Sequence, residues 1–248
     1  MAADAPAPPV PVRHAEGLVH GFLALRSLTG ADLATGDLTQ IAAGDRVTVQ
    51  VVFHFKDGSV QDETAVYTQR SVFRLVSDHL IQKGPTFPTT LDMMIDQPRG
   101  QVVVKYKEPG GAEKTATEHM TLPDDLANGI IPTILKNVRA QDAPVVLSFV
   151  AATPKPQLVK LNVSSAGQEP FSTDGQSRQA AHFVVKVEIG GLSGMFAPLV
   201  GKQPPDSHLW ILEGPAPAFV RSEALLYVGG PQVRIELVSP RFPKDDVR

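Results

Sequence analysis

Seven histidines are the residues best suited to acid–base or metal chemistry. They are His14, His20, His54, His79, His119, His182 and His208. None of them shows the H-x-H, H-x-x-x-H or H-E-x-x-H spacing that places two imidazoles on one side of a strand or helix. His54, His182 and His208 fall on expected strands, where they can line one face with polar neighbours. We therefore expect surface or hydrogen-bonded core histidines, no metal centre and no cofactor.

A second group consists of the carboxylates Asp57, Asp62 and Glu63, which could do acid–base work or bind calcium. Asp62 and Glu63 are consecutive on an extended segment, so their side chains point to opposite faces. A solvated turn is therefore the better interpretation of this group.

Motifs for a serine nucleophile or a phosphate loop are incomplete. Gly191-Leu192-Ser193-Gly194 departs from the G-x-S-x-G pattern, and no helix follows it. Gly201-Lys202-Gln203 lacks the hydroxyl residue and the upstream glycine of a phosphate loop. The chain has no cysteine, which excludes disulfides, thiolate metal sites and a cysteine nucleophile. We expect no enzyme, with a hydrolase whose residues converge from distant strands as the alternative.

The elements that would position these residues are mainly strands. Residues 46–56 alternate between apolar and polar side chains, which is the pattern of a half-buried strand. Their apolar set is Val47, Val49, Val51, Phe53 and Phe55. Asp57-Gly58 then supplies a hairpin turn into residues 60–69. The same alternation recurs about nine more times with short connections, which favour antiparallel neighbours.

Between residues 126 and 138 the apolar spacing changes to three or four, which predicts one helix near the middle of the chain. The repeating residues are Leu126, Ile130, Ile131, Ile134, Leu135 and Val138. Asp124 or Asp125 can cap its first turn. Pro132 removes one hydrogen bond within the helix, so we expect a kink or a break there.

These patterns predict a mainly β protein, a large curved antiparallel sheet forming an open, unclosed β-barrel of about ten or eleven strands with one central kinked helix. With 42% hydrophobic and 20% charged residues, the chain can bury the core of one such domain. We expect a flexible tail over residues 1–16, a single barrel over 17–242 and a solvated tail over 243–248. Within the barrel, residues 29–37 are interpreted as a turn region and residues 166–179 as a polar loop.

Charge and hydropathy limit the possible partners. The net charge is −3 and the signs are interspersed, so no basic stripe is present to hold nucleic acid. No stretch approaches the roughly 20 apolar residues of a membrane-spanning helix. Residues 2–9 are rich in alanine and proline, which is typical of the start of an exported mature protein and also of an ordinary disordered terminus. Neither the oligomeric state nor the organism can be read from these patterns.

The apolar surface suggests a binding function. A strongly bent sheet partly filled by the helix would leave a cavity for an acyl chain or another lipophilic ligand, although the same side chains would also make a filled core. The segment 190–201 is too rich in glycine for a stable helix and too apolar for an ordinary solvent loop. The candidate ligand-binding residues are Trp210, Phe183, Ile134, Met195 and Phe196.

The segment 208–212, His-Leu-Trp-Ile-Leu, and the segment 219–223, Phe-Val-Arg-Ser-Glu, carry a resemblance. Together with the strand succession, they resemble uncharacterised bacterial exported proteins related to the lipoprotein-carrier (LolA/LolB-like) group. In that group a strand with a single tryptophan precedes one with a basic and an acidic residue. The resemblance implies an unclosed β-barrel, closed by helices, that holds acyl chains in an apolar cavity in the periplasm. No functional residue is carried over from it.

The sequence therefore favours a non-enzymatic periplasmic or secreted protein that binds a lipid, another lipophilic ligand or an acylated partner protein between sheet and helix. The alternative is a structural or protein-interaction module of the bacterial envelope with a filled β core. The first predicts an apolar cavity near Trp210, and the second predicts an exposed apolar patch.

Overall fold

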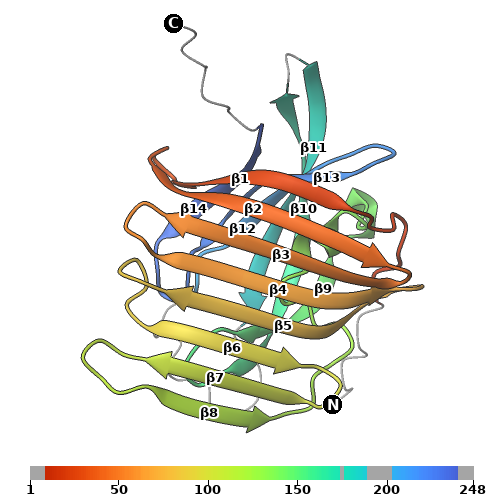
Figure 1. Ribbon diagram of the computed structural model, residues 1–248. Coiled ribbons are helices and arrows are strands. Elements are labelled where there is room, and N and C mark those ends of the chain that lie inside the picture. Colours follow the sequence, from red (N-terminus) through yellow and green to blue (C-terminus); the bar gives the residue numbers. More distant parts are fainter. Residues whose placement is uncertain (1–8, 174–175, 189–202, 240–248) are drawn as a thin grey trace, which may run out of the picture.

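The computed structural model describes residues 9–173, 176–188 and 203–239. Within them, 14 strands form one antiparallel sheet (Figure 1). The first eight strands are β1 (Val19–Ser27), β2 (Asp32–Ala43), β3 (Arg46–Phe55), β4 (Val60–Gln69), β5 (Phe73–Lys83), β6 (Thr90–Asp96), β7 (Gln101–Lys107) and β8 (Lys114–His119). The other six are β9 (Val145–Ala151), β10 (Gln157–Thr173), β11 (Gln176–Glu188), β12 (Ser207–Leu212), β13 (Ala218–Leu225) and β14 (Gln232–Val238). The helix α1 (Ile131–Leu135) and the 3-10 turn η1 (Ala140–Asp142) lie between β8 and β9 in the chain.

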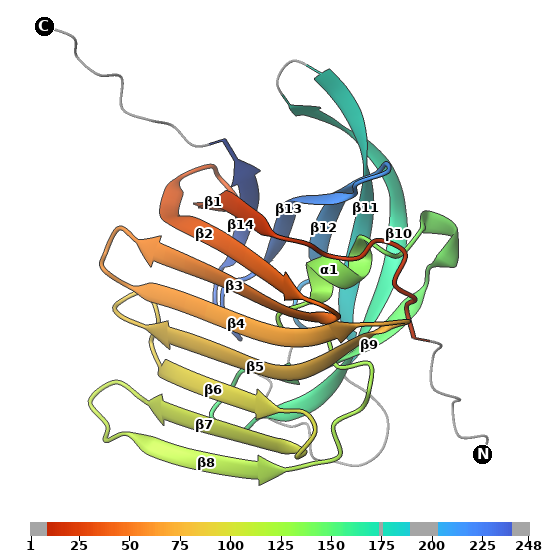
Figure 2. The ribbon, with the colours of Figure 1, turned by 45° about the vertical axis from the view of Figure 1, so that its right-hand side comes forward.

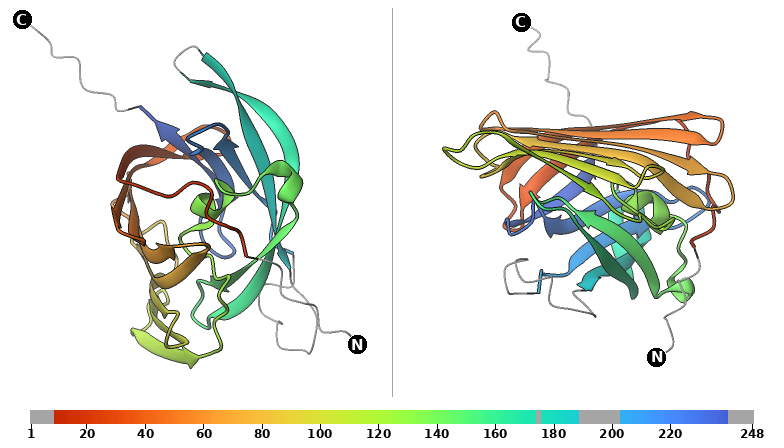
Figure 3. Two further views of the ribbon diagram at one scale, coloured as in Figure 1. Left: turned by 90° about the vertical axis from the view of Figure 1, so that its right-hand side faces the viewer. Right: turned by 90° about the horizontal axis from the view of Figure 1, so that it is seen from below.

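The sheet consists of two meanders that are joined by one long-range pairing. Its order runs from β8 to β1 and then from β14 to β9. Every pair is consecutive in sequence except β1 and β14, which pair antiparallel with Leu25 opposite Ile235. β1–β8 form one layer and β9–β14 a second layer facing it, with α1 between them (Figures 2 and 3). β8 and β9 are the edge strands of the sheet and do not pair with each other, so the barrel is open. The predicted fold class is confirmed.

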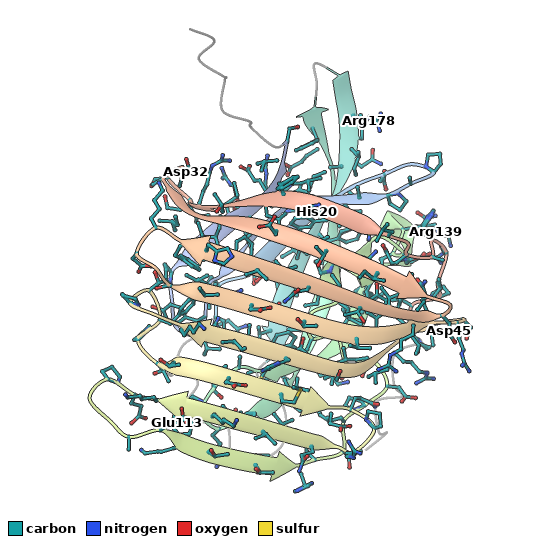
Figure 4. All side chains as sticks on the ribbon, in the orientation of Figure 1. His20, Asp32, Asp45, Glu113, Arg139 and Arg178 are labelled. Carbon is teal, nitrogen blue, oxygen red and sulfur yellow. The ribbon has the colours of Figure 1, made fainter. Side chains whose placement is uncertain are left out.

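Alternating burial fills the space between the layers. On β3, Val47, Val49, Phe53 and Phe55 are buried, as the alternation predicted. One cluster of buried apolar side chains joins β3–β7, the segment around α1, and β9–β12. Outward positions carry polar side chains, such as the exposed His20 on β1 (Figure 4). The core therefore lies inside the barrel and connects both layers.

The central helix is shorter than the apolar spacing predicted. α1 has five residues and begins at Ile131, with Pro132 in its first turn. Proline fits there because the first N–H groups of a helix have no partner inside the helix. Leu126 and Ile130 precede the helix and are nevertheless fully buried. The spacing thus identified buried residues correctly, while the proline starts the helix and does not kink it.

Two stretches interpreted as turn or loop are strands: one is the additional strand β2, and the other extends β10 and β11. β2 covers most of the region 29–37. β10 and β11 cover most of the region 166–179 and continue their hairpin there, with Phe171 opposite Arg178. This hairpin extends beyond the rest of the sheet (Figure 1).

Candidate functional site

One end of the barrel is covered by the N-terminal strap, residues 9–17, which lies beside α1 (Figure 2). Asn137 accepts the backbone N–H groups of two consecutive strap residues, each at 2.7 Å. The Glu16 backbone N–H donates to the Gln69 side chain at 2.6 Å, and the Gln69 amide donates back to the Glu16 carbonyl at 2.9 Å. The Glu16 carboxylate also pairs with Lys136 at 2.5 Å. Residues 13–16, which were expected to belong to a flexible tail, are therefore held against the barrel by hydrogen bonds and an ion pair.

A pocket of about 140 Å³ lies at the other end of β5, where the β5–β6, β9–β10 and β13–β14 connections meet. Its lining combines the polar residues Gln82, Thr89 and Thr153 with the apolar or aromatic residues Pro88, Leu91, Ala152, Pro154, Tyr227 and Val228. Phe87 is buried beside it and packs edge-on against Tyr227, with ring centroids 5.9 Å apart. Most of these groups are apolar, so the pocket suits a small apolar group.

Between the strap and the pocket, two carboxyl groups face the barrel interior from neighbouring strands. Glu63 on β4 lies two residues from Ala65, and Ala65 pairs with Asp78 on β5. On the strands that flank this pair, Glu63 lies opposite Val51 of β3 and Asp78 lies opposite Ile95 of β6. We call Glu63 and Asp78 the acid pair. It therefore lies in largely apolar surroundings.

Asp78 in this pair lacks the partners that a buried carboxyl group normally has. Its exposed fraction is 0%, and neither carboxyl oxygen has a hydrogen-bond partner. A Cβ added to Gly129 would lie 2.7 Å from Asp78 Oδ1 and 3.5 Å from Glu63 Oε1. The loop before α1 therefore rests directly on the acid pair. Since unsatisfied buried polar groups are rare and costly, Asp78 calls for a functional explanation.

The environment raises the pKa of both carboxyl groups. Burial raises the pKa of Glu63 from its ordinary 4.5 to about 7. Burial, followed by the charge of Glu63, raises the pKa of Asp78 well above its usual range. Two carboxylates this close cannot both ionise easily, so the pair retains a proton near neutral pH and can both donate and accept hydrogen bonds.

A β-bulge determines that Asp78 points inward. On β5, Phe73 and Leu75 are buried at odd positions, whereas Asp78 and Leu80 are buried at even positions. The register shifts between Val66 and the following residue of β4, and this shift changes which β5 residues face the core. A strict alternation along β5 would have turned Asp78 outward, so the sequence offered no clear signal for it.

The sequence did predict that Asp62 and Glu63 would diverge, and they do. Asp62 faces away from the interior and accepts a bond from Gln50 at 3.0 Å. Glu63 faces the interior, so the solvated-turn interpretation was wrong for this residue.

A second polar group, the outer-face cluster, consists of Glu169, His182, His208 and Trp210. Glu169 accepts a hydrogen bond from Trp210 Nε1 and contacts His182 Nδ1, each at 2.9 Å. His182 Nε2 lies 2.9 Å from His208 Nδ1. The His182 ring stacks on Trp210 with centroids 4.4 Å apart, and burial lowers the pKa of His182. This carboxylate–imidazole–imidazole chain can move a proton along the outer face of the sheet.

This cluster also bears on the hydrolase alternative. With a proton on Nδ1 directed to Glu169, neutral His182 accepts from His208 Nδ1–H, which leaves His208 Nε2 as a base. Within the described part of the chain, no hydroxyl group is hydrogen-bonded to either imidazole. The cluster thus contains a base and its orienting carboxylate but presents no nucleophile.

The predicted ligand-binding residues do not all come together. Phe183 and Ile134 are buried in the main core cluster inside the barrel. Trp210 belongs to a separate buried cluster with Ala180, on the opposite face of the sheet. Met195 and Phe196 lie outside the described residues. The ligand-binding role of all five residues stays a prediction.

Two further properties hold for the described residues. No group of three or more His, Cys, Asp or Glu side chains there is arranged to hold a metal ion. No helix in these ranges is long and apolar enough to cross a membrane.

Comparison with known proteins gives one distant structural neighbour. No family model matches the chain, and no curated protein matches it. A solved structure similar to it is that of a beta-barrel-like protein of domain of unknown function DUF1849 from Brucella abortus. The TM-score is 0.46 and the sequence identity is 11%, over 92% of this chain and 100% of that chain. The open-barrel architecture of this chain follows from its own strand order.

Proposed function

We propose that the protein is a non-enzymatic binding protein that holds a small lipophilic ligand between the two layers of its open barrel. The observation that carries this proposal is the apolar pocket at one end of an interior whose other end is covered by the strap. A ligand that enters at the pocket would meet the apolar core and the acid pair before it met the strap. In keeping with the resemblance to lipoprotein carriers, we propose an exported protein whose ligand carries an acyl or alkyl chain.

The size of the pocket limits the part of the ligand that it can hold. An apolar cavity of about 150 Å³ accommodates a benzene-sized molecule in proteins. The pocket here, at about 140 Å³, is comparable. Burying each CH₂ group contributes about 0.8 kcal/mol, so a six-carbon chain gains roughly 4–5 kcal/mol before association costs are subtracted. We therefore expect short probes to bind no more tightly than the millimolar range and longer natural ligands to bind more tightly.

Native mass spectrometry of protein from its own host, with an organic extract run alongside, would detect a co-purifying ligand. Titration with an environment-sensitive lipophilic dye would then measure binding directly. Trp210 lies on the outer face, so its fluorescence should stay constant during this titration and serve as an internal reference.

A pair of variants tests whether the pocket is the site. Ala152→Phe places a ring in the pocket and should reduce dye affinity at least tenfold. Ala112→Phe, at an exposed position between β7 and β8, is the matched control and should bind like the original chain. A clean apo mass together with no saturable dye binding would reject the proposal and favour the filled-core interaction module.

A further inference from the structure

We propose that the acid pair forms the polar end of this ligand site and selects a lipophilic primary amine, a cationic amphiphile, over a fatty acid. This inference rests on the proposed function and specifies its ligand. It starts from Asp78, which is fully buried with both carboxyl oxygens unpartnered. A ligand that supplies N–H donors to these oxygens would remove the cost of leaving them unsatisfied.

A row of polar side chains runs from the pocket toward the acid pair. Gln82 lines the pocket and donates to the Gln61 side chain at 3.1 Å and to the Leu226 carbonyl at 3.2 Å. Gln61 and Glu63 share the inward face of β4, where residues two apart are separated by about 7 Å. Glu63 keeps part of its surface accessible although it faces the interior. The acid pair is therefore the next polar group after Gln61 along the inward face of β4, counted from the pocket.

The charge of this site favours a cation. Within the described ranges, neither Glu63 nor Asp78 forms an ion pair with a lysine, arginine or histidine. Lys136, which follows α1, is paired with Glu16 of the strap. A protonated amine would supply the missing positive charge and up to three donors. A fatty acid would place a third carboxyl group beside two others, which like-charge repulsion disfavours.

The groups around the acid pair are uncharged or already compensated, so the acid pair is the group whose protonation should change when the ligand binds. The neighbours on adjacent strands, Val51 and Ile95, and the loop residue Gly129 carry no charge. Tyr67, two residues beyond Ala65 on β4, stays neutral because burial raises its pKa above the normal range. Farther toward the strap, Glu16 is already compensated by Lys136.

Binding should therefore be linked to proton release. The amine stays protonated to about pH 10, as a lysine side chain does. The acid pair binds it best when ionised, so affinity should rise as Glu63 loses its proton near pH 7. The rise between pH 6 and pH 8 should be about tenfold, because one ionisation near pH 7 changes its ionised fraction by about that factor.

Three six-carbon probes with one chain and different heads test this selection. Hexylamine, hexan-1-ol and hexanoate are titrated into the full chain at pH 6 and pH 8, with backbone amide NMR shifts near Ala152 and Tyr227 as the readout. Hexylamine should bind at least tenfold more tightly than hexan-1-ol at pH 8. Hexan-1-ol should show no pH dependence, and hexanoate should bind most weakly.

Two isosteric variants locate the effect. Glu63→Gln combined with Asp78→Asn should reduce hexylamine affinity to that of hexan-1-ol without changing the affinity for hexan-1-ol. Asp62→Asn, on the same strand but facing outward, should change neither. Amine and alcohol that bind equally, or a preference that survives the combined Glu63→Gln and Asp78→Asn change, would overturn this inference and leave the binding function intact. If none of the three probes bound, the proposed function itself would fail.

Discussion

Replacing Glu63 by glutamine should stabilise the protein at alkaline pH and leave its stability nearly unchanged at acidic pH. Burial raises the pKa of Glu63 from 4.5 to about 7, so the folded chain holds a proton that the unfolded chain has released. In the window between pH 4.5 and pH 7 the folded state binds more protons, and stability falls as the pH rises. Glutamine keeps the shape of the side chain and removes this ionisation.

The size of the effect follows from the pKa. At about 1.4 kcal/mol for each tenfold change in proton affinity, the rise from 4.5 to about 7 corresponds to roughly 3 kcal/mol above pH 8. This is a large part of the 5–15 kcal/mol that stabilises a typical domain. Loss of the Glu63 charge also relieves Asp78, whose pKa is raised partly by that charge. We therefore expect a gain of about 3 kcal/mol at pH 9 and almost none at pH 4.5.

Urea denaturation of the original chain and the Glu63→Gln variant at both pH values measures this gain. Comparing the two proteins cancels the carboxylates whose pKa is lowered by partners, such as Asp96 beside Arg99, because both proteins share them. Asp62→Asn is the control and should show no pH-dependent difference of this size. A Glu63→Gln effect that is equal at pH 4.5 and pH 9, or a loss of stability at pH 9, would refute the assignment of a buried acid pair.

Three further outcomes are expected. Gly129→Ala should lower the free energy of unfolding by about 3 kcal/mol or more in chemical denaturation, because φ is +68° and the new Cβ would meet two atoms at 2.7 Å. Gly110→Ala is the control: its φ is +70° but the Cβ would meet nothing within 4 Å, so the loss should be about 1–2 kcal/mol. Asn137→Ala removes two accepted bonds and one donated bond at a buried residue, so it should cost about 2–3 kcal/mol and speed hydrogen exchange in the strap. Acidification should quench Trp210 fluorescence with a midpoint below pH 6.5, because burial lowers the pKa of the stacked His182, and the transition should vanish in His182→Gln. The neutral ring also stabilises the fold, and this stability is lost as the pH falls below 6.5, since the unfolded chain then binds the extra proton.

Strands that follow simple alternation could be predicted from the sequence. β3 is the clearest case, because its inward residues are uniformly apolar and the Asp57-Gly58 turn leads into the paired β4. β2 was missed because its glycine resembled a turn signal. Gly36 lies opposite Phe53, and an added Cβ would come within 2.5 Å of that ring. This glycine is needed for a close approach within the sheet and does not mark a turn.

The long hairpin of β10 and β11 was missed for a different physical reason. Its outer part extends beyond the rest of the sheet (Figure 1), and the sequence from 166 to 179 is mostly polar. A polar composition therefore does not distinguish it from a solvent loop. Glu169 on β10 contacts His182 on β11 and Trp210 on β12, a set of contacts across strands that no local spacing in the sequence reveals.

The acid pair shows most clearly why site prediction from this sequence was limited. The sequence predicted that Asp62 and Glu63 point to opposite faces, but it did not show which of them faces the interior or that Asp78 lies beside it. The register shift beside Val66 reverses the alternation of β5, and without it the inward positions would be Ser77 and His79 in place of Asp78. A histidine opposite Glu63 would give an ordinary compensated pair, whereas the bulge gives two carboxyl groups and no cation. The same single-residue shift thus creates both the stability cost at alkaline pH and the uncompensated charge that a cationic ligand would neutralise.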